Sequence, residues 1–400
     1  MYTNATLWYT VLREILTVFG FFAFGHGIFF VILQILLMFG LFLEWRRDKY
    51  ASSAGKTCKT GITASLIVPV RNESLRINSL FQSLLAQDFS IEVIFVDDRS
   101  DDDSPAMLAG FVQKAEKQGL SNCRVITLTE NPGPNHKQYA LSVGIAEARG
   151  DFLLFTDGDC ELPPGWICAM VNRMNNETVG AVIGPVFKKK QGKGFFSLYQ
   201  CYDHAVRYIY LAGSIGLGAA GGGFGNNLIV RKAALDAIGG YDAVPPSPTE
   251  DAALISRIRS HSKYHVRAIV LPDAAIKTAA EKTWGNFIGQ TLRWNNGGLF
   301  SPEHLTRCNY NLLMLMTSTS ILALLLLPFF PSLWPMLTGV FVVMVTNTIA
   351  LFVLFRKKLP LGGPLNFGYV LSLLFTPVYF TLMTIMGYCR VKARWKGKIV

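Results

Sequence analysis

Asp157 and Asp159 flank a single glycine directly after an apolar run at residues 152–156. Two carboxylates at this spacing can face one divalent cation that also binds phosphate oxygens, because Mg²⁺ and Mn²⁺ prefer hard oxygen ligands. Acidic residues that follow a strand also commonly cap the next helix, so the pair alone is a weak signal. It predicts a metal site only where other polar groups meet it.

Two further apolar, β-branched runs end in polar residues. The run at 65–70 precedes Glu73, and the run at 91–96 precedes Asp97 and Asp98. Ligands bind parallel sheets beyond the carboxyl ends of their strands, so all of these residues are candidates for one binding site.

Strand and helix patterns alternate through this part of the chain. A fourth strand-like run lies at 124–128, and segments with helical periodicity lie at 77–86, 105–118 and 137–148. Short buried strands that alternate with helices predict an α/β fold with a doubly wound parallel sheet.

Glu250 and Asp251 follow the proline-rich segment 245–248. Carboxylates in the first turn of a helix are favoured by the helix dipole, and this explains the pair when it is taken alone. A carboxylate is equally suited to act as a general base. The local pattern leaves both roles open.

The segment 284–296 is predicted to be an amphipathic helix. At about 100° per residue, Gln290 and Arg293 share its polar face with Asn286, and Trp294 lies at the edge. We expect the apolar face, which carries Trp284, Ile288 and Leu292, to rest in the membrane interface. Arg293 could bind a diphosphate through two hydrogen bonds, and Trp294 could stack on a sugar ring. A core-packed aromatic and a surface arginine are the alternative.

Half of the 400 residues are hydrophobic and only 16% are charged, against about a quarter in soluble domains. The apolar residues gather at the two ends of the chain. An N-terminal run at about 7–43 and C-terminal runs at about 311–331, 333–355 and 365–388 are long enough to cross a bilayer.

Basic residues flank these apolar runs and account for much of the net charge of +11. This placement favours a membrane partner and a cytosolic location for the flanks, and no nucleic-acid-binding module is present. Three C-terminal spans would put the basic C-terminus outside, which conflicts with that tendency. A bent or re-entrant segment at Pro377 would remove the conflict.

Three weaker features complete the pattern. The seven cysteines form no C-x-x-C pair and are expected to be free thiols. The segment 187–196, with its run of lysines, is interpreted either as lying on anionic lipid headgroups or as a solvated loop. A G-x-G-x-x-G match at 216–221 follows a helix instead of a strand, so it is rejected as a dinucleotide site and interpreted as part of a flexible acceptor-side loop at 213–225.

The chain resembles the membrane-bound glycosyltransferases of family 2, a group that includes cellulose, chitin and hyaluronan synthases and ceramide glucosyltransferase. Six motifs carry the resemblance in the family's order: VPVRNE at 68–73, VDDRSDD at 96–102, HKQYAL at 136–141, TDGD at 156–159, TED at 249–251 and QTLRW at 290–294. His136 departs from the pattern, because the family usually has a glycine before the lysine.

The resemblance implies a GT-A-type doubly wound mixed sheet with N-terminal and C-terminal transmembrane helices. It implies inverting transfer of a sugar from a nucleotide diphosphate donor, a UDP-sugar, to an acceptor hydroxyl, with Asp251 as general base and Asp159 and Asp157 as ligands of Mg²⁺ or Mn²⁺. Residues implied in donor binding are Pro69, Val70, Glu73, Asp97, Asp98, Lys137 and Asp157. Residues implied at the leaving group or acceptor are Glu250, Gln290, Arg293 and Trp294.

The expected organisation is an N-terminal transmembrane anchor at 1–45, a cytosolic catalytic domain at 46–280, an interfacial helix at 281–305 and a C-terminal transmembrane region at 306–400. We expect a multi-pass protein of the bacterial plasma membrane. Its acceptor would be a membrane lipid or a growing polysaccharide; four spans are few for a polymer channel, which favours a lipid or help from an accessory membrane protein. The alternative is a transport or receptor protein with a non-catalytic nucleotide-sugar-binding domain.

Overall fold

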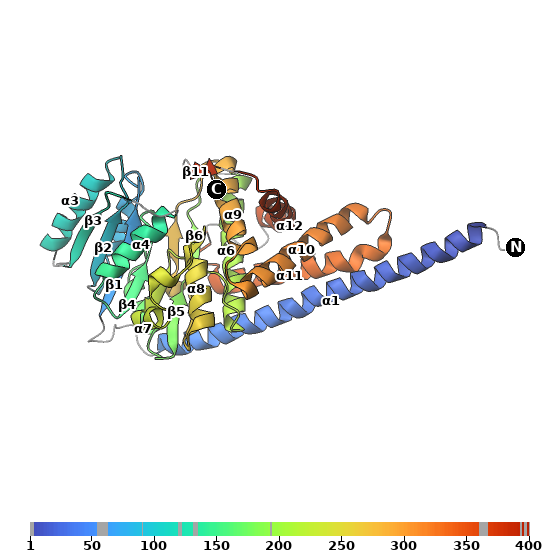
Figure 1. The fold of residues 1–400 in the computed structure, drawn as a ribbon, viewed down its shortest axis with the longest axis horizontal. Helices are drawn as coiled ribbons and strands as arrows, with labels where there is room; N and C mark the ends of the chain where they lie inside the picture. Colours follow the sequence, from blue (N-terminus) through green and yellow to red (C-terminus); the bar gives the residue numbers. More distant parts are fainter. Residues whose placement is uncertain are drawn as a thin grey trace.

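A seven-stranded mixed sheet forms the centre of the α/β part of the chain in the computed structural model (Figure 1). The structure describes residues 4–53, 63–89, 91–118, 122–130, 135–192, 194–359, 367–392, 394–395 and 398–399. The strand order is β3-β2-β1-β4-β7-β5-β8. The strands are β1 (Ala64–Val70), β2 (Glu92–Asp97), β3 (Cys123–Thr127), β4 (Phe152–Phe155), β5 (Val179–Ile183), β7 (Leu228–Arg231) and β8 (His265–Ala268).

The four strands predicted from the apolar runs are β1 to β4, and they pair in parallel as expected. β7 is antiparallel to both of its neighbours, which makes the sheet mixed. In the register, Val70 lies opposite Asp97, and Ile67 lies opposite Phe155. The residues that follow β1, β2 and β4 therefore emerge at one edge of the sheet.

Helices cover both faces of the sheet because alternate strand residues point to opposite sides. One face packs against α2 (Asn78–Leu85), α3 (Ser104–Lys117) and α5 (Trp166–Asn172). The other face packs against α4 (His136–Glu147), α6 (Phe195–Gly216) and α8 (Glu250–His261). The short helix α7 (Lys232–Asp236) follows β7, and a two-stranded sheet of β6 (Val186–Lys188) and β9 (Ile276–Thr278) lies beside the main one.

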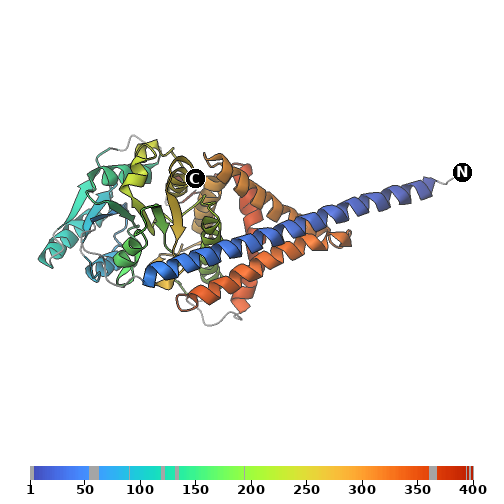
Figure 2. The ribbon, with the colours of Figure 1, turned by 90° about the horizontal axis from the view of Figure 1, so that it is seen from below.

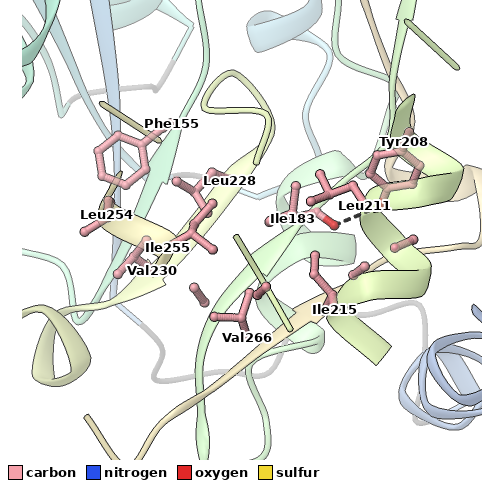
Figure 3. Packing of buried hydrophobic residues seen from close by; sticks show 14 of the residues in the cluster. Phe155, Ile183, Tyr208, Leu211, Ile215, Leu228, Val230, Leu254, Ile255 and Val266 are labelled. Atoms are coloured by element: carbon pink, nitrogen blue, oxygen red, sulfur yellow. Dashed lines mark hydrogen bonds between the residues drawn. The ribbon is translucent and has the colours of Figure 1, made fainter. Parts of the chain in front are cut away.

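The core between the sheet and α6 is largely apolar, and Tyr208 brings a hydroxyl group into it (Figure 3). Tyr208 is buried and donates a hydrogen bond to the carbonyl of Ile183, at the end of β5, at 3.0 Å. Its ring packs with Leu211 and Ile215 of the same helix in the same cluster. The buried hydroxyl is thereby satisfied, and α6 is fixed against the sheet.

Among the described residues, four helices are long and apolar enough to cross a membrane, as the sequence predicted. They are α1 (Asn4–Ser53), α10 (His304–Leu326), α11 (Trp334–Phe355) and α12 (Phe367–Tyr388). The first helix runs well past the expected anchor boundary at residue 45. α1, α10 and α11 extend together away from the sheet, whereas α12 is seen end-on in Figure 1 and so lies across their direction (Figures 1 and 2).

α1 packs against α6 at a contact that only glycines permit. A Cβ atom at Gly40 would collide with the backbone of Gly213, and one at Gly216 would collide with the backbone of Gly40. Small residues let helix backbones approach closely in this way. The close contact places α6 directly beside the membrane helix.

The C-terminal part of α1 is anchored in the α/β part by two buried carboxylates. Asp48 accepts hydrogen bonds from the backbone N–H groups of Val270 and Leu271 at 2.9 and 2.7 Å, and from Arg173 Nε at 2.7 Å. Glu44 accepts one from the N–H of Ala268 at 2.8 Å. The membrane helix and the sheet are therefore held as one unit.

The expectation that all cysteines are free thiols is wrong at one position. Cys168 of α5 is disulfide-bonded, whereas Cys123, Cys160, Cys201, Cys308 and Cys389 are free. A sequence without a paired-cysteine motif gave no sign of this bond, because disulfide partners are brought together by the fold and not by spacing.

The Asp48→Ala variant is expected to lose about 3–5 kcal/mol of stability, because it breaks a buried ion pair and leaves two backbone N–H groups unsatisfied. Thermal unfolding in detergent would measure this. The matched control is Glu161→Ala, which breaks half-exposed pairs with Lys189 and Lys277 at 3.1 and 3.4 Å. It is expected to change stability by less than about 1 kcal/mol. Equal losses in the two variants would contradict the anchoring role of Asp48.

Candidate active site

One cavity of about 1240 Å³ lies between the sheet edge, α6, α9 (Trp284–Leu299) and the membrane helices. It brings together motifs from distant parts of the chain. The predicted site residues in its wall are Pro69, Val70, Glu73, Lys137, Asp98, Asp157, Asp159, Glu250, Asp251, Gln290, Arg293 and Trp294.

Lys137 is the centre of a cluster of charges in this cavity. Its Nζ lies 2.7 Å from Asp157 Oδ1 and 3.4 Å from Glu250 Oε1. Burial opposes the charge on the lysine, but Asp157, Glu250 and Asp251 outweigh it and raise the pKa of Lys137 above its usual range. The ammonium therefore stays charged and links the end of β4 to the start of α8.

Asp251 is held by two backbone donors at the first turn of α8. Gly225 N–H donates to its Oδ2 at 2.7 Å, and Ala252 N–H donates to its Oδ1 at 2.8 Å. Burial, together with the charge of Glu250, raises the pKa of Asp251 to about 6, although Lys137 acts in the opposite direction. A carboxylate of this kind is ionised at neutral pH and more basic than a solvated aspartate.

The loop after α6 is needed for this geometry. Residues 221–226 line the cavity, so part of the segment expected on the acceptor side lies in its wall. A Cβ atom at Gly225 would lie 2.9 Å from the Cβ of Asp251. The loop can reach the carboxylate with its N–H because residue 225 has no side chain.

The two strand-end aspartates occupy different environments. Asp157 is paired with Lys137, whereas Asp159 accepts a hydrogen bond from Thr278 Oγ1 at 3.1 Å. Within the described residues, no group of three or more His, Cys, Asp or Glu side chains could hold a metal ion. The donor set fits a divalent cation only if a ligand such as a diphosphate supplies the remaining oxygens.

Of the two neighbouring aspartates Asp97 and Asp98, only Asp98 lies in the wall of the cavity. Asp98 lines it and pairs with Arg71 at 3.1 Å and with Arg99 Nε at 2.9 Å. Asp97 is buried and is not part of the cavity wall; its Oδ1 accepts the N–H of Ser100. The side chain of Asp97 therefore stabilises the turn after β2, and its direct contact with a donor stays a prediction.

The middle of α9 brings the motif residues Gln290, Arg293 and Trp294 into the cavity. Gln290 accepts a hydrogen bond from Lys188 Nζ at 2.8 Å and donates to Glu281 Oε1 at 3.0 Å. Arg293 donates to the carbonyl of Pro248, just before α8. The Lys188 ammonium lies 5.6 Å from the centre of the Trp294 ring. The polar face of α9 is therefore tied to both the catalytic segment and the small sheet.

The apolar face of α9 does not lie on the membrane as predicted. Leu292 is fully buried, and Phe287 stacks on Tyr379 of α12 with ring centres 5.5 Å apart. Of the three residues expected at the interface, only Trp284 is exposed, at 37%. The correction has a simple cause: α6 and α12 cover this face, and the spacing of apolar residues along a helix does not reveal which element covers them.

The segment 187–196 also differs from its lipid-headgroup interpretation. Phe187 and Lys188 are buried, and Phe187 packs against Phe355 of α11. Burial lowers the pKa of Lys188, while Glu281, Asp159 and Asp203 act against that effect. Lys188 belongs to the cavity, and the run of lysines gave no sign that one member points inward.

Three cavity residues on α6 were missed at the sequence level: Asp203, His204 and Arg207. The sequence did contain a sign of these residues, because charged residues four positions apart in an otherwise apolar helix share one face. Asp203 and Arg207 form an ion pair at 2.9 Å. None of the six motifs includes them, so only their proximity to Trp294 assigns them to the site.

Comparisons with known proteins agree with this arrangement. Residues 65–239 match the model of "Glycosyl transferase family 2". A beta-monoglucosyldiacylglycerol synthase from Synechocystis sp. is 27% identical over 238 residues, which cover 58% of this chain and 47% of that protein. A GalNAc(5)-diNAcBac-PP-undecaprenol beta-1,3-glucosyltransferase from Campylobacter jejuni is 30% identical over 129 residues, or 32% of this chain and 39% of that protein. The chain spans about half the length of the curated relatives it matches.

A solved structure supports the fold over nearly the whole chain. A mannosyltransferase from Pyrobaculum calidifontis, in complex with GDP-Man and Mn²⁺, superimposes with a TM-score of 0.51 at 17% identity, covering 92% of this chain and all of that one. At this identity the likeness concerns the fold alone. The expected fold is confirmed: the chain is built on a mixed α/β sheet of GT-A type, and its residues 65–239 are similar to the glycosyltransferases of family 2.

Proposed function

We propose that this protein transfers a sugar from a UDP-sugar to a hydroxyl of a membrane lipid, with inversion at the anomeric carbon. The observation that carries the proposal is the position of Asp251 in the same cavity as Asp157 and Asp159. Displacement of the nucleoside diphosphate in a single step needs a base for the acceptor hydroxyl and carboxylates on the donor side in the same cavity. A lipid acceptor is supported by the names of two relatives, one a synthase of a glucosylated diacylglycerol and the other a glucosyltransferase named for an undecaprenol-linked saccharide.

The donor is proposed to lie along the edge formed by the ends of β1, β2 and β4. Pro69, Glu73 and Asp98 line this part of the cavity and would surround the base and ribose. Arg293 and Lys137 would face the diphosphate, where cations stabilise the leaving group. Asp97 would act indirectly, through the turn that positions Asp98.

Asp159 and Asp157 are proposed to hold Mg²⁺ or Mn²⁺ together with the donor phosphates. The ion would neutralise charge as the nucleoside diphosphate leaves. The bound Mn²⁺ in the Pyrobaculum calidifontis mannosyltransferase is consistent with such an ion. Lys137 would hold Asp157 in place at 2.7 Å whether or not an ion is bound.

Asp251 is proposed to accept the proton of the acceptor hydroxyl on the face opposite the leaving group. Its two backbone donors fix the orientation of the carboxylate, and a pKa of about 6 makes it basic and still ionised at neutral pH. One displacement of this kind inverts the anomeric centre, as in inverting glycoside chemistry.

The membrane arrangement is proposed to contain three crossing helices and one interfacial helix. α1, α10 and α11 share a direction, and α12 lies across it (Figure 1). One side of α12 exposes apolar residues at helical spacing: Phe367, Val370, Leu371, Leu374, Val378, Leu382 and Ile385. Its other side packs on α9 through Tyr379. With three crossings, the basic C-terminal residues return to the cytosol, which resolves the charge conflict noted in the sequence.

The Asp251→Asn variant is expected to lower kcat by about 10²–10⁴-fold, because the carboxamide cannot accept the proton. UDP binding should change little. Transfer of radiolabelled sugar from a panel of UDP-sugars to membrane lipids would measure the rate. Asp103→Asn, which changes an exposed carboxylate at the start of α3, is the matched control and should keep full activity. Unchanged turnover in Asp251→Asn would remove it as the base; UDP binding without any transfer by the wild type would favour the transport or receptor alternative.

The pH dependence of kcat/KM is expected to show an acid limb with a midpoint at about 6, since protonation of Asp251 removes the base as the pH falls. Glu250→Gln removes a charge that raises this pKa, so the midpoint should move down by about one pH unit. Lys137→Met removes a charge that lowers it, so the midpoint should move up by a similar amount. Shifts in the same direction would contradict the assignment of the limb to Asp251.

The topology is testable with two native exposed cysteines, Cys308 in the second turn of α10 and Cys389 after α12. In intact cells a membrane-impermeant maleimide should label neither, but should label a cysteine introduced by Phe329→Cys in the exposed α10–α11 turn. Permeabilised cells should give labelling at all three positions. Labelling of Cys389 in intact cells would show that α12 crosses the membrane.

A further inference from the structure

A polar cluster interrupts the buried face of α6 between the catalytic residues and the membrane helices. Asp203 and His204 are 2% and 3% exposed, and Arg207 follows one turn later. All three line the cavity. Buried polar groups are costly unless they are satisfied, so this cluster requires an explanation.

Several atoms of the cluster have no hydrogen-bond partner among the described residues. These atoms are Nδ1 and Nε2 of His204, Oδ1 of Asp203 and Nη2 of Arg207. Most buried polar groups in native proteins are paired. Donors and acceptors left over in a cavity wall are therefore positioned for a ligand that brings its own donors and acceptors.

Aromatic rings form the sides of this subsite and connect it to the proposed base. The His204 ring lies 4.5 Å from the ring of Phe224 and 5.5 Å from that of Trp294. The residue after Phe224 is Gly225, whose N–H holds Asp251. A group bound at His204 is thus next to the loop that orients the carboxylate.

The same cavity continues away from the polar cluster along apolar side chains of the membrane helices. Its wall includes Leu33 and Leu37 of α1, Leu313 of α10, and Val343 and Met344 of α11. A ligand that fills both parts has a polar end at α6 and hydrocarbon between the helices. That is the shape of a membrane lipid, with its headgroup facing Asp251.

The charges around the cluster are already balanced. Arg207 is paired with Asp203 at 2.9 Å, and Lys188 donates to Gln290 and is attracted by Glu281 and Asp203. Burial, with the nearby Lys188 and Arg207, lowers the pKa of His204 far below its usual value, so the imidazole is neutral. A phosphate placed here would bring further negative charge next to Asp203, whose own charge already holds Arg207 at 2.9 Å, and the two anions would repel each other.

We propose that Asp203, His204 and Arg207 bind the headgroup of the lipid acceptor, and that this headgroup is uncharged and carries hydroxyls, as in a diacylglycerol or ceramide. A hydroxyl can donate to Asp203 Oδ1, and a neutral imidazole offers one donor and one acceptor. The inference rests on the proposed function, because it names the acceptor class for that same site.

A matched pair of short-chain lipids tests the headgroup preference without any sugar donor. The full-length chain in phosphatidylcholine nanodiscs would be titrated with dioctanoylglycerol and with dioctanoylphosphatidic acid, and binding would be counted by native mass spectrometry. The uncharged lipid is expected to bind about tenfold more tightly, which corresponds to the repulsion of one added charge near Asp203. Equal or tighter binding of the phosphatidic acid would overturn the inference.

Two variants separate binding from structure. His204→Phe keeps a ring and should weaken dioctanoylglycerol binding about 3- to 10-fold, because it removes the donor and acceptor. Asp203→Asn leaves Arg207 unmatched and should shift the preference towards dioctanoylphosphatidic acid, a change that a merely structural role would not produce. Tyr202→Phe is the control, since Tyr202 is buried on the same helix but contacts Thr348 and not the cavity. Unchanged binding in His204→Phe would contradict the proposal.

The inference and the proposed function can fail separately. If Asp251-dependent transfer to lipids is observed but lipid binding ignores His204 and Asp203, the headgroup subsite is wrong and the enzyme activity stands. If the wild type transfers no sugar from any UDP-sugar to any lipid, the proposed function fails, whatever the binding assay gives.

Discussion

The ion pairs of Lys137 are the constraint on which the rest of the site depends. They bring the carboxylates of Asp157 and Glu250, which come from the end of a strand and the start of a helix far apart in sequence, to 2.7 and 3.4 Å from one ammonium. Without that cation, the donor-side and base-side carboxylates would repel each other in a cavity of low polarity. With it, Asp251 can lie close to the donor edge with a raised but usable pKa.

The membrane helices contribute to the site as well as to its location. Asp48 and Glu44 fix the end of α1 to β8 and the segment after it, and glycines bring α1 into contact with α6. α6 then forms one wall of the cavity. Its polar residues line one part of the cavity, and apolar residues of α1, α10 and α11 line the adjoining part. This continuity supports the proposed lipid acceptor, because one cavity offers both environments that an amphiphile needs.

α12 contributes Thr376, Pro377 and Phe380 to the wall of the cavity. It buries the apolar face of α9 while presenting its own apolar residues outwards. An interfacial helix in this position would shield the cavity from water at the membrane surface and leave entry from the lipid phase. Exclusion of water strengthens each electrostatic contact in the cavity and protects the donor from hydrolysis.

The sequence by itself determined the first four strands, the helices between them, the four apolar helices and the motif residues of the candidate site. These features are local: buried strands and spanning helices have characteristic lengths and periods, and polar residues at parallel strand ends share one edge. The disulfide at Cys168, the burial of Lys188 and Leu292, and the displacement of Asp97 from the cavity were decided only by the tertiary structure. Each depends on which distant element covers a given face, and periodicity carries no information about that partner. For the same reason the sequence did not predict the polar cluster on α6. Its charged residues can be seen in the sequence, but the helices that enclose them come from distant parts of the chain.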